Sequence, residues 1–190
     1  MLKKGANEKM TESLPKKIKK ILFVGLDAAG KTSIVKSLTG TKSLPSFSNI
    51  SPTKGEDQVS IKLSDSDFSI WDLGGQESFR EEYLTDFNKY LFGCSKLIYV
   101  FDIQDTKRYD LALEYFQKVI DLTVEKMEAN NIELSIFFHK FDPDLNRTDI
   151  TEEIVNGLKD KVKEKLDTTD FFYQIFKTTI YAIFEKIVID

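Results

Sequence analysis

Eight residues near the amino end have the types and spacing of a phosphate-binding loop. Gly25-Leu26-Asp27-Ala28-Ala29-Gly30-Lys31-Thr32 fits the pattern G-x-x-x-x-G-K-[S/T] and lies between an apolar run and an amphipathic segment. Glycines let successive backbone N–H groups turn toward a phosphate, and a helix that begins there adds the positive end of its dipole. The lysine offers an ammonium to the β- and γ-phosphates, and the threonine hydroxyl suits Mg²⁺. The residues predicted to surround the phosphates are Asp27, Ala28, Ala29, Gly30, Lys31, Thr32 and Ser33.

A second motif, Trp71-Asp72-Leu73-Gly74-Gly75-Gln76, follows a predicted strand. Its aspartate is placed to hold Mg²⁺ through water, Gly75 to donate its backbone N–H to a γ-phosphate, and Gln76 to orient an attacking water. Taken alone, an aspartate before glycines usually marks a turn. Together with the phosphate loop, it predicts nucleotide hydrolysis with Lys31 and Gln76 as catalytic residues.

The segments that position these motifs alternate between strand and helix patterns. Short apolar or alternating runs predict strands at 21–24, 59–63, 68–72, 97–101, 136–138 and 171–173, and helical spacing predicts helices after residue 31 and at 108–129, 154–166 and 180–188. Residues 40–56 have no apolar period and indicate a long functional loop. We expect an α/β fold, a P-loop NTPase three-layer sandwich with a mostly parallel six-stranded sheet and helices on both faces. The strands at 59–63 and 68–72 should form a hairpin.

Composition limits the class of protein. The chain has 190 residues, of which 41% are hydrophobic, and a formal net charge of -4, which argues against bulk nucleic-acid binding. Residues 1–18 form a predicted basic tail, since residues 1–20 hold seven lysines against two glutamates. The tail is either a solvated leader or a weak peripheral contact with an anionic membrane or an acidic partner. A lone cysteine, Cys94, and the lack of a long apolar run predict a cytoplasmic protein.

With these motifs the chain resembles the Arf group of Ras-like small GTPases. Residues 25–32 and 71–76 carry the resemblance, and Pro52-Thr53-Lys54-Gly55 is similar to the family's switch I segment. Residues 83–85, 97–102, 138–142 and 181–184 are similar instead to the Rag (Gtr) GTPases. The resemblance covers about residues 19–189, so 19–190 is expected to be one GTPase domain. It implies GTP/GDP and Mg²⁺ as ligands, with Thr32, Thr53 and Asp72 around the metal.

The resemblance also implies a guanine pocket. His139-Lys140-Phe141-Asp142 is similar to the histidine form of the N-K-x-D motif found in Rag proteins. Asp142 can accept from guanine N1–H and N2–H₂, whereas adenine presents an acceptor at N1, and the Lys140 stem should lie on the purine. For His139, a structural link between strand and phosphate loop competes with proton transfer. The family's last motif, S-A-K or T-S-I, gives a backbone N–H to guanine, and alignment assigns it to Tyr173, Gln174 and Ile175.

The expected function is a molecular switch that binds GTP and slowly hydrolyses it to GDP. Two alternatives are a nucleotide-loaded adaptor that scarcely hydrolyses GTP and a small-molecule phosphotransferase. The expected partners are effector, exchange-factor and activating proteins, with roadblock-type proteins among the candidates. No arginine of the chain can be assigned to the γ-phosphate, so an activator is expected to supply one in trans. Dimers built through a C-terminal roadblock domain are not expected, and the oligomeric state stays open.

Overall fold

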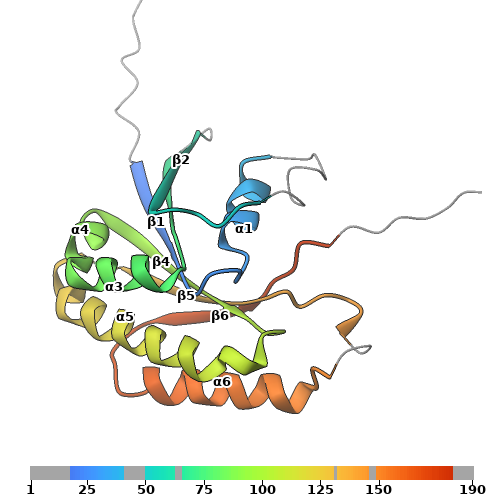
Figure 1. The fold of residues 1–190 in the computed structure, drawn as a ribbon. Helices are drawn as coiled ribbons and strands as arrows, with labels where there is room; N and C mark the ends of the chain where they lie inside the picture. The colour runs from blue at the N-terminus through green and yellow to red at the C-terminus, as the bar shows by residue number, and fades with distance from the viewer. Residues whose placement is uncertain (1–17, 41–49, 63–65, 131, 146–148, 182–190) are drawn as a thin grey trace, which may run out of the picture.

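A six-stranded sheet forms the centre of the molecule, in the order β2-β3-β1-β4-β5-β6 (Figure 1). The computed structural model describes residues 18–40, 50–62, 66–130, 132–145 and 149–181. All neighbouring strands are parallel except β2 and β3, which form the predicted antiparallel hairpin. The strands are β1 (Ile18–Val24), β2 (Glu56–Lys62), β3 (Asp67–Leu73), β4 (Cys94–Asp102), β5 (Glu133–His139) and β6 (Tyr173–Lys177).

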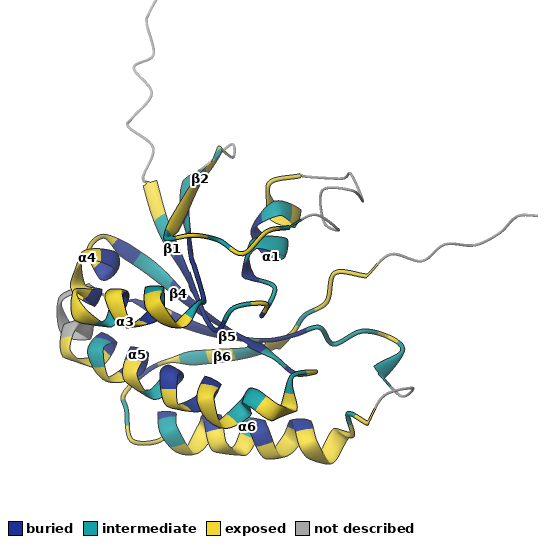
Figure 2. Ribbon diagram, viewed as in Figure 1, coloured by how far each residue is buried: buried dark blue, intermediate teal, exposed yellow. Residues whose placement is uncertain are grey.

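Helices cover both faces of this sheet, which confirms the predicted three-layer α/β sandwich. On one face, α1 (Lys31–Leu38) packs Ile34 and Val35 against Phe23 of β1. On the other face, β1 turns Leu22 and Val24 toward the larger core. The helices contributing to that core are α3 (Glu77–Thr85), α4 (Phe87–Leu91), α5 (Tyr109–Asn130) and α6 (Glu152–Leu166), and a short 3₁₀ turn (Thr106–Arg108) precedes α5. Figure 2 shows the buried residues gathered on the central strands and on the inner sides of these helices.

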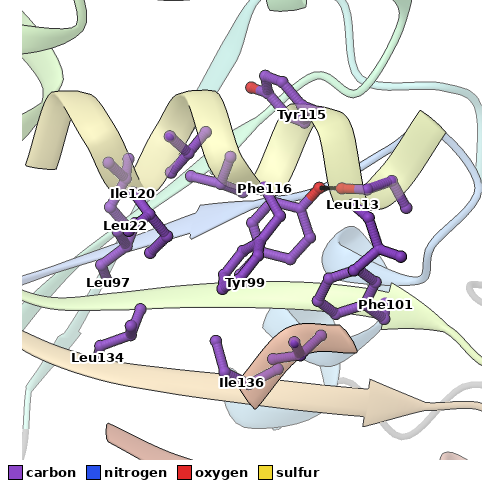
Figure 3. Packing of buried hydrophobic residues seen from close by; sticks show 14 of the residues in the cluster. Leu22, Leu97, Tyr99, Phe101, Leu113, Tyr115, Phe116, Ile120, Leu134 and Ile136 are labelled. Carbon is purple, nitrogen blue, oxygen red and sulfur yellow. Dashed lines mark hydrogen bonds between the residues drawn. The ribbon is translucent and has the colours of Figure 1, made fainter. Parts of the chain in front are cut away.

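The contact between β4 and α5 is the most aromatic part of the core. Figure 3 shows Tyr99 and Phe101 of β4 beneath Phe116 of α5. The Phe116 ring centroid lies 4.9 Å from that of Tyr99 and 5.5 Å from that of Phe101, both in edge-to-face orientation. The Tyr99 hydroxyl donates to the Ala112 carbonyl at 2.7 Å, so its buried polar atom is satisfied. Because β4 is central, this contact holds the sheet and the α5 layer in register.

The last strand was predicted in the wrong place. The expected strand at 171–173 is β6 at Tyr173–Lys177, and Phe171 is buried against the larger core before the strand begins. As an edge strand, β6 is half exposed, so its pairing with β5 leaves little apolar signal, whereas the buried Phe171 gives a strong one. Residues 1–17 of the predicted tail, Leu63 and residues 182–188 of the predicted last helix lie outside the described residues. Ile18 begins β1, and Ile180 and Tyr181 are not helical. Among the described helices, none is both long and apolar enough to cross a membrane.

Truncating the ring at the centre of the β4–α5 contact should destabilise the whole domain. We expect Phe116→Ala to lower the free energy of unfolding by about 3–5 kcal/mol, since it removes a fully buried ring and leaves a cavity. Urea denaturation measures this. The matched control, Phe172→Ala, removes a ring that is 77% exposed and should change stability by less than ~0.5 kcal/mol. Equal losses in the two variants would contradict the assigned core.

Candidate nucleotide-binding site

A cavity of about 310 Å³ opens at the carboxyl ends of the parallel strands, within the size range of ligand pockets. This edge of a parallel α/β sheet is where ligands usually bind. Most of the residues predicted to bind a nucleotide line the cavity. The lining residues are Asp27, Ala28, Ala29, Gly30, Lys31, Thr32, Ser33, Ile50, Ser51, Pro52, Thr53, Gly75, Gln76 and Lys140.

Lys31 is buried at the floor of the cavity. Its ammonium donates to the carbonyls of Gly25 at 2.9 Å and Leu26 at 2.8 Å, so the lysine closes the loop on itself. Burial lowers the pKa of Lys31 to about 8, although the negative charges of Asp72 and Asp27 act in the opposite direction. The ammonium is therefore incompletely compensated by the protein. An anion in the cavity would restore the usual pKa of Lys31 and relieve the cost of its burial.

Gly75 lies directly against the phosphate-binding loop. The Asp27 N–H donates to the Gly75 carbonyl at 3.0 Å. A Cβ on Gly75 would lie 2.1 Å from the Asp27 nitrogen, which is closer than any side chain can approach. Glycine is therefore required here by contact with the loop. Gln76, the next residue, is the N-cap of α3, but its side chain makes no capping hydrogen bond and lines the cavity instead.

Three oxygen-bearing side chains from separate segments meet beside the loop. Thr32 Oγ1 lies 2.9 Å from Thr53 Oγ1 and donates to Asp72 Oδ2 at 2.5 Å, and Thr53 Oγ1 donates to the same oxygen at 3.3 Å. Asp72 is 1% exposed, and its other oxygen, Oδ1, is buried without a hydrogen-bond partner. Burial raises the pKa of Asp72, against the hydrogen bond from Thr32 and the charge of Lys31. The cluster has the hard oxygen donors that a small divalent cation prefers.

His139 joins the phosphate loop to the end of the sheet. Its ring occupies the space beside Gly30, where a Cβ on the glycine would lie 2.4 Å from His139 Cδ2. Its Nδ1 is 2.9 Å from the Thr178 hydroxyl, in the segment after β6. Burial, aided by the neighbouring Lys140 charge, lowers the pKa of His139 from its usual value, which favours the neutral imidazole. These contacts favour the structural interpretation of His139 over proton transfer.

Lys140 and Asp142 occupy the turn after β5, next to the cavity. The Lys140 ammonium pairs with Asp102 Oδ2 at 2.5 Å, and Lys140 has a φ of 62°, a conformation uncommon for residues other than glycine. Each oxygen of Asp142 accepts one hydrogen bond: Oδ1 from Thr179 Oγ1 at 2.5 Å and Oδ2 from Gln104 Nε2 at 2.8 Å. The carboxylate is therefore fixed by residues from two other segments.

The residues predicted to form the last guanine-contacting motif, 173–175, lie within the sheet. Gln174 and Ile175 lie inside β6, paired with Ser135 and Ile136 of β5. Because they belong to the sheet, they do not form the loop that follows it. The loop that reaches Asp142 begins at Thr178 and Thr179. Thr178-Thr179-Ile180 differs from the family's T-S-I by one hydroxyl-bearing residue, and this likeness could have located the loop.

An ion pair that the sequence analysis did not predict braces the phosphate loop. Arg108, in the 3₁₀ turn before α5, donates to Asp27 Oδ1 at 2.8 Å and to the Asp27 carbonyl at 3.2 Å. The same guanidinium also pairs with Asp105 at 2.5 Å. The two partners are 81 residues apart in the chain, so no local pattern could reveal them. The pair fixes one wall of the cavity.

Comparisons with known proteins agree with this geometry. The family model described as the Gtr1/RagA G protein conserved region matches residues 20–190. ADP-ribosylation factor-like protein 3 of Chlamydomonas reinhardtii is 37% identical over 123 residues, which is 65% of this chain. That match spans 63% of the relative, a little under two thirds of its length.

A solved structure shares the fold. The Arl6 BBS3 small GTPase of Trypanosoma brucei, with the bound nucleotide analogue GppNp, matches with a TM-score of 0.67 and 18% identity, covering 86% of this chain and 87% of that one. At this identity the likeness concerns the fold. The family model spans nearly the whole chain and carries the assignment: this protein belongs to the Gtr1/RagA family of Ras-like small GTPases, with Arf-like features in its sequence.

Proposed function

We propose that this protein is a GTP/GDP-dependent molecular switch that slowly hydrolyses GTP. The observation that carries the proposal is the shared cavity. The incompletely compensated Lys31 ammonium, the Thr32–Thr53–Asp72 oxygen cluster and Gln76 face one space, and the Asp142 carboxylate lies beside it. Phosphates would lie on residues 27–33, and guanine would lie on Lys140 and face Asp142.

Mg²⁺ fits the oxygen cluster. Two neighbouring ligands of an octahedral Mg²⁺ with bonds of about 2.1 Å are roughly 3 Å apart, and the hydroxyl oxygens of Thr32 and Thr53 are 2.9 Å apart. The orphaned Oδ1 of Asp72 is an acceptor for a metal-bound water. Thr32 and Thr53 would hold the ion directly and Asp72 through water. The bound ion would supply positive charge that neutralises the transferring phosphoryl group.

The residues of this chain supply positioning for hydrolysis. Gln76 would orient the attacking water, since its carboxamide is not used for capping. Lys31 would stabilise the charge that develops on the phosphoryl oxygens, and the Gly75 N–H would position the γ-phosphate. Among the described residues, no arginine lines the cavity to stabilise the γ-phosphate, so intrinsic hydrolysis should be slow.

An activating protein is proposed to complete the site in trans. Within the described residues, Arg80 is buried over the Tyr115 ring at 5.2 Å and Arg108 pairs with Asp27 and Asp105. Neither of these arginines lines the cavity. Effector, exchange-factor and activating proteins are the proposed partners, with roadblock-type proteins as candidates, and the location is proposed to be cytoplasmic.

Base specificity tests the proposal most directly. Asp142→Asn places an N–H₂ group where guanine has its own amino donor, whereas xanthine has a carbonyl there. We expect the variant to lose roughly tenfold to a thousandfold in GTP affinity and to shift its preference toward XTP. Competition binding of GTP, ATP and XTP measures both. Asp144→Asn, in the same turn, is the control and should keep the wild-type order. A wild type without preference for GTP over ATP would refute the guanine pocket.

Replacing the glutamine in the cavity should separate catalysis from binding. Gln76→Leu should slow single-turnover GTP hydrolysis by roughly ten- to a hundredfold and leave GTP affinity within about threefold, because Gln76 acts only in the transition state. Gln58→Leu, on the exposed edge strand β2, is the control and should hydrolyse at the wild-type rate. An unchanged rate in Gln76→Leu would assign catalysis to other residues, and a wild type with no multiple-turnover phosphate release would favour the adaptor alternative.

Removing one hydroxyl should weaken the proposed metal site. Thr32→Val keeps the side-chain shape but loses a direct ligand, so we expect the Mg²⁺ concentration for half-maximal GTP retention to rise by at least about tenfold. Fluorescent-nucleotide release across a Mg²⁺ titration measures it. The control, Thr39→Val, alters an exposed hydroxyl at the end of α1 that bonds only locally. Identical titration curves for Thr32→Val and wild type would exclude Thr32 as a ligand.

A further inference from the structure

Gln104 lies at the carboxyl end of β4, in the turn that faces the base-reading residues. Its side-chain amide nitrogen donates twice, to the Lys140 carbonyl at 2.8 Å and to Asp142 Oδ2 at 2.8 Å. Both partners are acceptors only, so the group that faces them must be the N–H₂ end of the amide. One exposed side chain thus bridges the backbone of the turn and its carboxylate.

Gln104 is itself held in place. Its backbone N–H donates to Asp102 Oδ1 at 3.0 Å, and Asp102 Oδ2 pairs with the Lys140 ammonium. The preceding residue, Ile103, donates its N–H to the His139 carbonyl at 3.2 Å. These hydrogen bonds connect the turn after β4 to the turn after β5. They hold the backbone of Gln104 in place and so give its side-chain amide a defined position.

Counting the acceptor sites on Asp142 shows what this contact achieves. A carboxylate has about four lone-pair sites, two on each oxygen. Gln104 fills one on Oδ2 and Thr179 fills one on Oδ1. One site remains on each oxygen, and guanine presents two donors, N1–H and N2–H₂. The protein donors thereby stop rotation of the carboxylate and leave a pair of acceptors that matches guanine.

We propose that Gln104 is a positioning residue for guanine specificity, acting through the Asp142 carboxylate. The inference rests on the proposed role of Asp142 in reading guanine. Gln104 does not touch the reacting phosphates, and it adds to the affinity for guanine nucleotides only through the orientation of Asp142 and the Lys140 turn. Adenine nucleotides, which cannot use the Asp142 acceptors, should be almost indifferent to the Asp142 part of this contact.

The test compares GDP and ADP affinities of full-length variants. Gln104→Met keeps the side-chain length but cannot donate, and it should reduce the ratio of GDP to ADP affinity by roughly three- to tenfold. Gln104→Glu should reduce the ratio further, because it places an acceptor opposite the carboxylate. In an Asp142→Ala background, Gln104→Met should change the ratio of GDP to ADP affinity by less than about twofold.

The matched control is Gln117→Met on α5, where the glutamine also donates to an aspartate, Asp121, at 2.7 Å but lies outside the nucleotide cavity. It should leave the GDP to ADP ratio unchanged. A Gln104→Met variant with the wild-type ratio, or one that lowers GDP and ADP affinity by equal factors, overturns the inference while the guanine pocket stands. A wild type that binds GDP and ADP equally overturns the proposed function itself.

Discussion

The buried ammonium of Lys31 sets the conditions that the rest of the site must meet. A lysine is almost never buried without partners, because its charged form loses hydration. Two loop carbonyls and nearby carboxylates stabilise the ammonium only in part, as the lowered pKa of Lys31 shows. Because the positive charge of Lys31 is only partly compensated, the cavity favours binding of an anion. Binding of a phosphate would also stabilise the conformation of the loop that binds it, so ligand binding and local order are coupled.

Backbone hydrogen bonds connect the phosphate loop to the segment after β3 and that segment to the residues before β2. The Gly75 carbonyl accepts from Asp27 in the loop, and the Gly74 N–H donates to the Gly55 carbonyl, two residues after Thr53. The phosphate loop, the segment after β3 and the segment before β2 are therefore joined in series by backbone hydrogen bonds beside the cavity. The backbone of Gly75 is in direct contact with the backbone of the loop. The segment after β3 can therefore move only if its backbone separates from the loop. This geometry suits a two-state element biased by the γ-phosphate.

The sequence predicted the class of fold and the hairpin, but not the order of the strands in the sheet. The residue types and spacing of 25–32 and 71–76 were enough to predict a nucleotide-binding role for these segments, because each motif is contiguous in the sequence. The helical pattern of 154–166 places Ile154, Leu158, Val162 and Leu166 on one face, and the last three are buried. Ile154 is instead 37% exposed and Val155 is buried, although both lie at helical spacing from Leu158. Leu111 is likewise 40% exposed, while Ala112 packs in the core. The helical spacing of apolar residues does not by itself show which of two adjacent rows of side chains is buried, because tertiary packing decides which row faces the sheet.

The two ends of the proposed nucleotide would be bound by different kinds of structure. The sequence predicted the phosphate loop and Asp142, but not the residues that hold the Asp142 carboxylate. The phosphate end would be bound by backbone N–H groups and a lysine within eight successive residues, so its sequence signature is local. At the base end, Asp142 is held by Gln104 and Thr179, which are 38 and 37 residues away in the chain. Their meeting depends on the parallel register of β4, β5 and β6, which places the three turns side by side. Thr179 was missed because the last motif was assigned to Tyr173, Gln174 and Ile175, which belong to β6. Gln104 could be recognised only once the fold had brought it to the carboxylate.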